Sequence, residues 1–317
     1  MTTATTLDWG ERSARWAGVR GDVVEMAGTR VHLLRADGPA DGGGTPQLLV
    51  HGLGGSATNW IEVMAGLAEH GPVVAPDLPG FGRTEPPHPR ASRITANVAF
   101  LVAFLRRLGW DRAVVHGNSM GGMLATLLAD RAPELVERLV LASPALPAPR
   151  SRMHEIDPMT AMRFLPFLVP GVGRVAVRGL QARLSPEQEW AQTARFLHGD
   201  AQRLSPELQA VGLENLAAGR EQPWRLSGLV GAAESLLSAL LRARGLVRAI
   251  DTIAAPTLVV WGDADRLVGQ AVIDHLAERR PDWDLAALPA VGHVPMAEAP
   301  DDYLAAVARF YAGEPQA

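Results

Sequence analysis

The stretch AVVHGNSMGG, at residues 113–122, contains the pattern G-x-S-x-G between an apolar run and a segment with helical spacing. The apolar run is typical of a strand buried on both faces, so the pattern predicts a very tight turn from strand to helix at Ser119. Such a turn strains the backbone of the serine, and the glycines at 117 and 121 keep the neighbouring backbone segments apart. We interpret Ser119 as a nucleophile; a glycine-rich turn with an incidental serine is the alternative.

Further apolar runs without alternation lie on either side of this turn along the chain, at Gln47–Val50, Pro72–Ala75, Leu139–Ala142, Thr257–Trp261 and Leu285–Leu288. Segments with apolar residues three or four positions apart occupy 92–108, 120–129, 267–279 and 301–311, and Gly109 is placed to end the first of them. Residues 23–34, before all of these, predict a hairpin. The alternation of strand and helix predicts right-handed crossovers and hence an α/β fold with a doubly wound, mostly parallel sheet.

The alternation breaks off between Pro144 and Ile250, where no strand pattern occurs and helix signals are frequent. Ser185-Pro186 and Ser205-Pro206 each place an N-cap residue before a proline at the first helical position. We therefore predict two units: a core domain formed by residues 1–143 and 251–317, and an inserted helical cap, or lid, formed by residues 144–250.

A serine hydroxyl needs a base within hydrogen-bond reach and a carboxylate that fixes the tautomer of that base. His293 follows the last predicted strand and Asp265 follows the strand before it, in the order Ser, Asp, His that a nucleophile elbow on such a sheet requires. Asp263, two residues earlier, is the rival acid, and His116 is interpreted as a packed residue at a strand end. We predict Ser119, Asp265 and His293 as catalytic residues; a purely structural His293 is the alternative.

A third glycine-rich segment, HGLGG at residues 51–55, follows the apolar run that ends at Val50. An oxyanion needs two preorganised backbone donors. We predict that the N–H of Met120, next to the nucleophile, supplies one donor and that the N–H of Leu53 supplies the other. A flexible loop or a phosphate cradle is the alternative, although the spacing does not match the dinucleotide fingerprint G-x-G-x-x-G.

Composition excludes several other kinds of protein. The 317 residues contain no cysteine, and all 30 basic residues are arginine, so thiol nucleophiles, Cys-based zinc sites, Schiff-base lysines and P-loop lysines are absent. The formal charge of −4 and the 5% aromatic content argue against nucleic-acid binding. No apolar run is long enough for a membrane span or, within residues 1–20, for a secretory signal. We expect a cytoplasmic protein with no cofactor and no metal.

Five motifs together carry a family resemblance: HGLGG at 51–55, DLPGFGRT at 77–84, GNSMGG at 117–122, WGDAD at 261–265 and GHVPMAEAP at 292–300. With them the chain resembles the α/β-hydrolase superfamily over nearly its whole length. The resemblance implies an eight-stranded, mostly parallel sheet, a helical cap inserted after the sixth strand, and the triad Ser119, Asp265 and His293. It therefore agrees with the interpretation of the residues themselves.

Departures from particular branches narrow the expected activity. Haloalkane dehalogenases and epoxide hydrolases use an aspartate where this chain has Ser119. The string GNSMGG is similar to that of meta-cleavage-product hydrolases, which cut carbon–carbon bonds, but those enzymes usually carry a tryptophan where this chain has Val294. We therefore predict a serine esterase of the lidded carboxylesterase and lipase type. The alternatives are a carbon–carbon hydrolase and a member of the superfamily that binds small ligands without turnover.

The expected partner is a small to medium apolar ester or lactone. Met153, Met159, Met162, Phe164, Phe167 and Leu168 suit an apolar acyl pocket by composition. The alternative is that these side chains pack the cap onto the sheet. The oligomeric state is not predicted.

Overall fold

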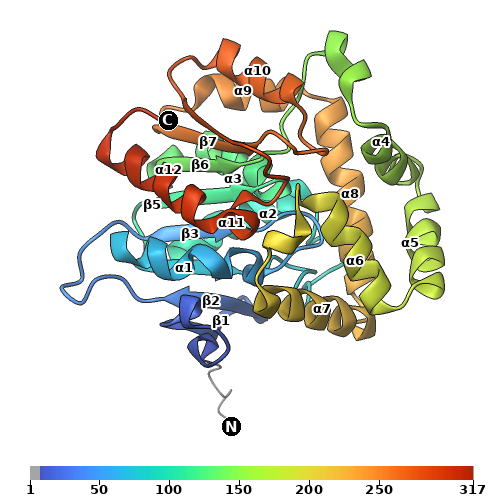
Figure 1. The fold of residues 1–317 in the computed structure, drawn as a ribbon, viewed down its shortest axis with the longest axis horizontal. Coiled ribbons are helices and arrows are strands. Elements are labelled where there is room, and N and C mark those ends of the chain that lie inside the picture. The colour runs from blue at the N-terminus through green and yellow to red at the C-terminus, as the bar shows by residue number, and fades with distance from the viewer. Residues whose placement is uncertain (1–7, 317) are drawn as a thin grey trace.

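A single sheet of eight strands forms the centre of the protein, in a computed structural model that describes residues 8–316. Residues 1–7, part of the segment expected to carry no secretory signal, and residue 317 lie outside the described residues. The strand order is β1-β2-β4-β3-β5-β6-β7-β8 (Figure 1). The strands are β1 Val19–Met26, β2 Thr29–Ala36, β3 Gln47–Val50, β4 Val73–Pro76, β5 Ala113–Asn118, β6 Val136–Ala142, β7 Thr257–Gly262 and β8 Asp284–Leu288.

Antiparallel pairing is confined to one edge of the sheet. The hairpin β1–β2 and the pair β2–β4 are antiparallel, and every pair from β4 to β8 is parallel. The predicted hairpin is confirmed and is longer than expected, with its turn at Ala27 and Gly28, which both have positive φ. Parallel pairing aligns the carboxyl ends of β3, β5, β6, β7 and β8, so the loops after these strands meet at one edge.

Helices cover both faces of the sheet, and a group of helices extends beyond its carboxyl edge (Figure 1). The helices of the first kind are α1 Ile61–Leu67, α2 Ile94–Arg107, α3 Met120–Arg131, α10 Gln270–Arg279, α11 Pro295–Glu298 and α12 Pro300–Ala312. The group between β6 and β7, called the inserted helices here, comprises α4 Pro158–Phe164, α5 Val172–Arg183, α6 Pro186–Leu197, α7 Pro206–Glu221, α8 Arg225–Leu241 and α9 Arg244–Thr252. Of these, α9 does not extend beyond the edge but lies beside α10 and packs against α3 (Figure 1). That they form a cap subdomain separate from the core stays a prediction.

The apolar runs of the strands divide between two cores, one on each face of the sheet. In β3, Leu48 and Val50 join one cluster while Leu49 joins the other. In β5, Val115 joins the first cluster and Val114 the second. Successive side chains of a strand point to opposite faces, so a strand covered by helices on both sides needs apolar residues throughout. This is why the parallel strands lack polar alternation.

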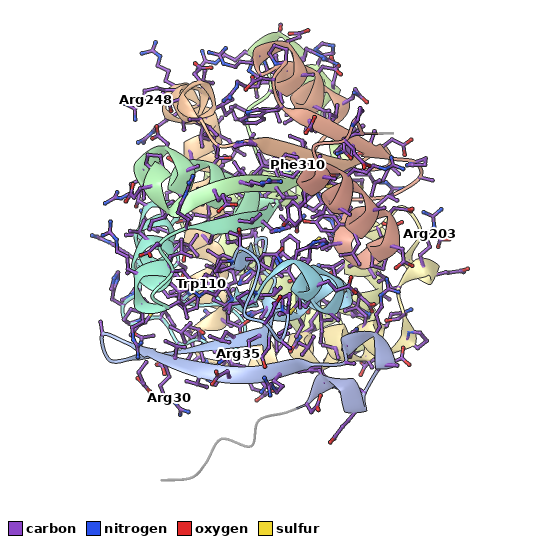
Figure 2. All side chains as sticks on the ribbon, turned by 90° about the vertical axis from the view of Figure 1, so that its left-hand side faces the viewer. Arg30, Arg35, Trp110, Arg203, Arg248 and Phe310 are labelled. Atoms are coloured by element: carbon purple, nitrogen blue, oxygen red, sulfur yellow. The ribbon has the colours of Figure 1, made fainter. Side chains whose placement is uncertain are left out.

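The outer edge of the sheet differs from its centre. Figure 2 labels Arg30 and Arg35 on the β1–β2 hairpin, where their side chains are 63% and 48% exposed. Both arginines lie on β2; the edge strand itself, β1, carries Arg20, Asp22 and Glu25, and charged side chains on an edge strand discourage pairing with another chain. Within residues 8–316 no single helix has both the length and the hydropathy to cross a membrane; α8 and α9 meet that test only as a pair bent by 77°.

Candidate active site

The turn between β5 and α3 holds Ser119 in a strained backbone conformation. Its φ is 55° and its ψ is −118°, a combination that a residue with a side chain rarely adopts. The Ser119 N–H donates to the carbonyl of Ala142 on β6 (3.1 Å), and the Ser119 carbonyl accepts from the N–H of Ala145 (2.9 Å). The strain is therefore held by hydrogen bonds to the neighbouring strand and to the chain that follows it.

The two flanking glycines are required by contact as well as by conformation. A Cβ on Gly117 would lie 2.3 Å from the carbonyl oxygen of Gly121, and a Cβ on Gly121 would lie 2.1 Å from the carbonyl oxygen of Val50. Both distances are well inside van der Waals contact. The predicted reason for the glycines in the motif, close approach of neighbouring backbone, is confirmed.

The loops after β7 and β8 bring Asp265 and His293 together. Nδ1 of His293 lies 2.8 Å from Oδ2 of Asp265, and both residues are buried, at 4% and 7% exposure. The other carboxylate oxygen of Asp265 accepts hydrogen bonds from the N–H groups of Leu267 (2.8 Å) and Val268 (3.0 Å). Backbone donors therefore fix one oxygen of the carboxylate, and the other oxygen accepts from Nδ1 of the imidazole. Among residues 8–316, Nε2 of His293 has no hydrogen-bond partner.

The rival acid has a different contact. Asp263 is exposed, and its Oδ1 accepts from the N–H of Ala290 (2.6 Å) in the loop after β8. It therefore stabilises the loop that leads to His293 without touching the imidazole. His116 is packed in the sheet as predicted: it is fully buried and its ring nitrogens lie 2.9 Å and 3.1 Å from the hydroxyls of Tyr303 and Tyr311.

The side chain of Asn118 connects the serine turn to the histidine loop. Its Nδ2 donates to the carbonyls of His293 (3.0 Å) and Ala142 (3.1 Å). Ser119 itself is half-buried, and its hydroxyl has no hydrogen-bond partner among residues 8–316. Catalytic hydrogen bonds are often long or poorly aligned until substrate binds. The bond from Asn118 to the carbonyl of His293 is what places the histidine loop beside the serine turn. Sequence reasoning gave no role to Asn118, although it lies inside the motif.

The HGLGG segment lies against the serine. A Cβ on Gly52 would be 3.1 Å from Cβ of Ser119, which places this loop beside the nucleophile. Within the described residues neither the N–H of Leu53 nor that of Met120 has a hydrogen-bond acceptor. Two free donors beside a serine are the arrangement that an oxyanion needs.

The imidazole of His51 joins this loop to the chain after β4. Nδ1 of His51 lies 2.8 Å from the carbonyl of Gly52, and Nε2 lies 3.1 Å from the N–H of Leu78, which donates to it. Burial lowers the pKa of His51 to about 4, while the bond to Gly52 opposes the shift and the charge of Arg225 adds to it. His51 is therefore neutral at pH 7, with one ring nitrogen donating and the other accepting.

Arg225, on α8 of the inserted helices, also holds the loop. Its Nη2 donates to the carbonyl of Gly54 (2.8 Å), and its guanidinium lies 5.9 Å from the centre of the Phe81 ring. Burial lowers the pKa of Arg225, and the charge of Asp77 acts against that shift. Sequence analysis gave no role to Arg225, because no local pattern links α8 to a loop more than 160 residues earlier.

Glu298 fastens the histidine loop to the inserted helices. It is only 3% exposed. Its Oε2 accepts from the N–H groups of Gly292 (2.8 Å) and Gly199 (3.0 Å), and its Oε1 accepts from that of Asp200 (2.8 Å). The N–H of His293 itself donates to the carbonyl of Leu197 (2.6 Å). The segment 197–200 and the loop that carries His293 therefore form one hydrogen-bonded unit, and the sequence signal for it was the glutamate inside GHVPMAEAP.

Two expectations about the inserted region need correction. Met153, Met159 and Met162 are 48%, 47% and 60% exposed, and Leu168 is 46% exposed, so they neither line an enclosed acyl pocket nor pack onto the sheet. Phe164 and Phe167 are half-buried. The error has a physical reason, since composition reports which side chains are apolar but not which way a helix turns them.

Metal binding has no support in the described residues. Within residues 8–316 no three histidine, aspartate or glutamate side chains are grouped so that they could hold a metal ion.

The chain matches one protein family over most of its length. Residues 46–300 match the alpha/beta hydrolase fold family. The chain is 27% identical over 297 residues to 2-hydroxy-6-oxononadienedioate/2-hydroxy-6-oxononatrienedioate hydrolase of Burkholderia vietnamiensis, covering 92% of this chain and 93% of that protein. It is 28% identical over 278 residues to pimeloyl-(acyl-carrier protein) methyl ester esterase of Pectobacterium atrosepticum, covering 84% and 94%.

Among solved structures, the crystal structure of a membrane phospholipase A superposes with a TM-score of 0.72 at 27% identity, covering 96% of this chain and 90% of that one. The span that matches the family, residues 46–300, runs from β3 to the start of α12 and contains Ser119, Asp265 and His293. The predicted fold class, an eight-stranded, mostly parallel sheet with helices on both faces, is confirmed. The chain belongs to the alpha/beta hydrolase fold family.

Proposed function

We propose that this protein is a serine hydrolase of carboxylic esters, including lactones, in which Ser119 is the nucleophile, His293 the base and Asp265 the group that orients the base. The observation that carries the proposal is the 2.8 Å contact between His293 and Asp265 in loops that hydrogen bonds hold beside the strained serine turn. A histidine oriented by a buried carboxylate, in a loop hydrogen-bonded to the residue before a serine on an elbow, supports acyl transfer.

The chemistry follows from these positions. Oγ of Ser119 attacks the carbonyl carbon while Nε2 of His293 takes the hydroxyl proton, and the oxyanion that forms is held by the N–H groups of Leu53 and Met120. The imidazolium, stabilised by Asp265, then protonates the leaving alcohol, which departs and leaves an acyl-serine. Water, deprotonated by the same imidazole, attacks the acyl group, and collapse of the second oxyanion returns the proton to Ser119. No cofactor enters any step.

The substrate class rests on chemistry and on the relatives together. Esterolysis is the activity named for the Pectobacterium relative, which is similar over most of both chains. The guanidinium of Arg225, beside the HGLGG loop, donates to the Gly54 carbonyl, and its charge is opposed by that of the buried Asp77. We therefore propose small to medium esters of low charge, with the inserted helices acting as a cap over them.

A fluorophosphonate probe tests the nucleophile directly. The wild-type protein is expected to gain the mass of one phosphonyl group on Ser119, and Ser119→Ala is expected to gain none. Asp265→Asn and Asp263→Asn form a matched pair, because the two aspartates are two residues apart and only the first contacts the imidazole. We expect Asp265→Asn to lower kcat about 10⁴-fold and Asp263→Asn to lower it less than tenfold. Equal losses in the pair would contradict the assigned roles.

A carbon–carbon hydrolase is the second candidate, favoured by the motif GNSMGG and by the activity named for the Burkholderia relative. A panel of p-nitrophenyl esters of rising chain length, set against a vinylogous diketo acid, separates the two. The ester proposal predicts higher kcat/KM on at least one ester. Labelling of Ser119 without turnover of either substrate would instead favour a member of the superfamily that binds small ligands.

A further inference from the structure

Exposed apolar side chains gather on one part of the inserted helices. Of the twelve large apolar side chains that are exposed within residues 8–316, ten lie between Met153 and Leu180, while Leu241 and Leu285 lie elsewhere. We call these ten the outer apolar surface: Met153, Ile156, Met159, Met162, Leu165, Leu168, Val169, Val172, Val175 and Leu180. Scattered exposed apolar residues are normal, whereas a concentration of this kind marks a surface that something covers.

The orientation of α5 shows that the exposure is built into the fold. Val172, Val175 and Leu180 share one side of this helix by their spacing of three to eight residues, and they are 45%, 71% and 46% exposed. Gly173, at the border of this side, is buried; a Cβ there would lie 2.5 Å from the ring of Phe167. The helix thus turns three of its large apolar side chains outward, the reverse of a helix whose apolar face builds a core.

The position of these elements leaves the surface open. Figure 1 shows α4 and α5 at the edge of the molecule beyond α8, on the side away from the sheet. The 3-10 segment η7, Leu165–Leu168, joins them and packs against α8. Leu165 on η7 is 63% exposed and Met162 on α4 is 60% exposed. No described part of the chain covers these side chains.

The charge of the same segment is opposite to that of the rest of the chain. Residues 150–183 contain six arginines and two acidic residues, a formal charge of +4, whereas the whole chain carries −4, which leaves −8 on the remainder. Arg152 is paired with Glu155 and Asp274. Arg150, Arg178 and Arg183 are exposed and have no ion-pair partner among residues 8–316.

We propose that the outer apolar surface lies on an anionic lipid surface, with Arg178 and Arg183 contacting headgroups. Apolar side chains interspersed with unpaired arginines are the combination by which a helix binds in the plane of a membrane interface. A second copy of this chain fits less well, because a two-fold contact would place one segment of charge +4 against another. The association is peripheral and does not require the proposed activity.

Vesicle co-sedimentation tests the proposal with the full-length protein. Large vesicles of phosphatidylglycerol and phosphatidylcholine are compared with vesicles of phosphatidylcholine alone, at low and at high salt. We expect binding to the anionic vesicles, at least tenfold weaker binding to the neutral ones, and loss of binding as salt screens the arginines. Equal binding to both vesicles, or binding to neither, would overturn the proposal.

Matched variants locate the contact. The double substitution Leu165→Asp with Val175→Asp should reduce the vesicle partition coefficient more than tenfold, and Leu241→Asp, on an exposed leucine outside the surface, should leave it unchanged. Arg178→Gln with Arg183→Gln should reduce it about tenfold, and Arg30→Gln, on the hairpin in Figure 2, should not.

A separate measurement addresses a second copy as the occupant. Sedimentation velocity is expected to give the same mass for the wild-type protein and for the double aspartate variant. A wild-type dimer that this variant converts to monomers would instead assign the surface to self-association and overturn the lipid proposal. Thermal unfolding of each variant within a few degrees of the wild type shows that the exposed substitutions leave the fold intact.

Discussion

Replacing Glu298 by glutamine tests whether the inserted helices hold His293 in place. The carboxylate accepts three backbone N–H bonds of 2.8 to 3.0 Å, from Gly199, Asp200 and Gly292. Glutamine has the same shape but only one accepting oxygen, so its amide group must face at least one of these donors. A hydrogen bond to a charged group contributes about 1.5–3 kcal/mol, and losing one or two of them predicts a free energy of unfolding lower by about 2–4 kcal/mol.

The same substitution should slow the reaction. Gly292 directly precedes His293, and the N–H of His293 is bonded to Leu197 in the segment that Glu298 also holds. A base displaced by about 1 Å lowers the rate by up to about 10²-fold, so we expect Glu298→Gln to lower kcat on a p-nitrophenyl ester by about tenfold to a hundredfold. The change in KM should be small, because Glu298 is buried and its side chain bonds neither the HGLGG loop nor the turn at Ser119.

Glu62→Gln is the matched control. Glu62 is also buried, at 5% exposure, and it accepts a hydrogen bond from Ser205 at 2.5 Å, but none of its contacts involves the histidine loop. Urea unfolding and steady-state kinetics on both variants separate the effects: both should lose stability, and only Glu298→Gln should lose kcat. If Glu298→Gln kept wild-type kcat while losing the predicted stability, the coupling of Glu298 to His293 would be refuted.

The remaining predictions concern backbone contact and buried charge. Gly121→Ala places a Cβ 2.1 Å from the carbonyl oxygen of Val50 and should lower the free energy of unfolding by at least about 3 kcal/mol. Gly179→Ala, which meets open space within α5, should raise the free energy of unfolding by up to about 1 kcal/mol. Urea titration of both variants checks the pair. His51 binds a proton near pH 6.5 in the unfolded chain but only near pH 4 in the folded protein, so the unfolded state holds more protons between these pH values. The contribution of His51 to stability therefore falls as the pH is lowered, by about 3 kcal/mol at pH 4. His51→Gln should make the slope of unfolding free energy against pH shallower without abolishing it, because burial also lowers the pKa of His116, to about 3. Substitution of the exposed His154 should leave the slope as it is, and an unchanged slope in His51→Gln would contradict the assignment to His51.

Local sequence pattern predicted most of the sheet, because strands covered on both faces leave a strong signal. The run at Gln47–Val50 coincides with β3, and the runs near β4, β6, β7 and β8 differ from the observed strands by one to three residues at an end. The short helix α1, Ile61–Leu67, was not predicted; its seven residues are too few for clear periodicity, and it packs against α11 and α12.

The three proposed catalytic residues can be recognised in the sequence because each follows a strand. Ser119, Asp265 and His293 stand after β5, β7 and β8, and parallel strands bring their carboxyl ends to one edge whatever the loops contain. The preference for Asp265 over Asp263 rested only on its place in the loop. The contacts now support that preference, since Asp263 bonds the backbone of Ala290 and Asp265 bonds the imidazole.

What the linear sequence determined by itself was therefore the fold class, the elbow and the order of the site residues, since each depends on local periodicity and on the close packing of glycine. Only the tertiary structure decided which polar groups hold those residues: Asn118 between the serine and histidine loops, Arg225 on the HGLGG loop, and Glu298 between the histidine loop and the inserted helices. These contacts join segments up to 175 residues apart, and their strength comes from burial in a packed interior. The outward turn of the apolar side of α5 was likewise decided in three dimensions, because periodicity identifies a stripe but not the direction in which it points.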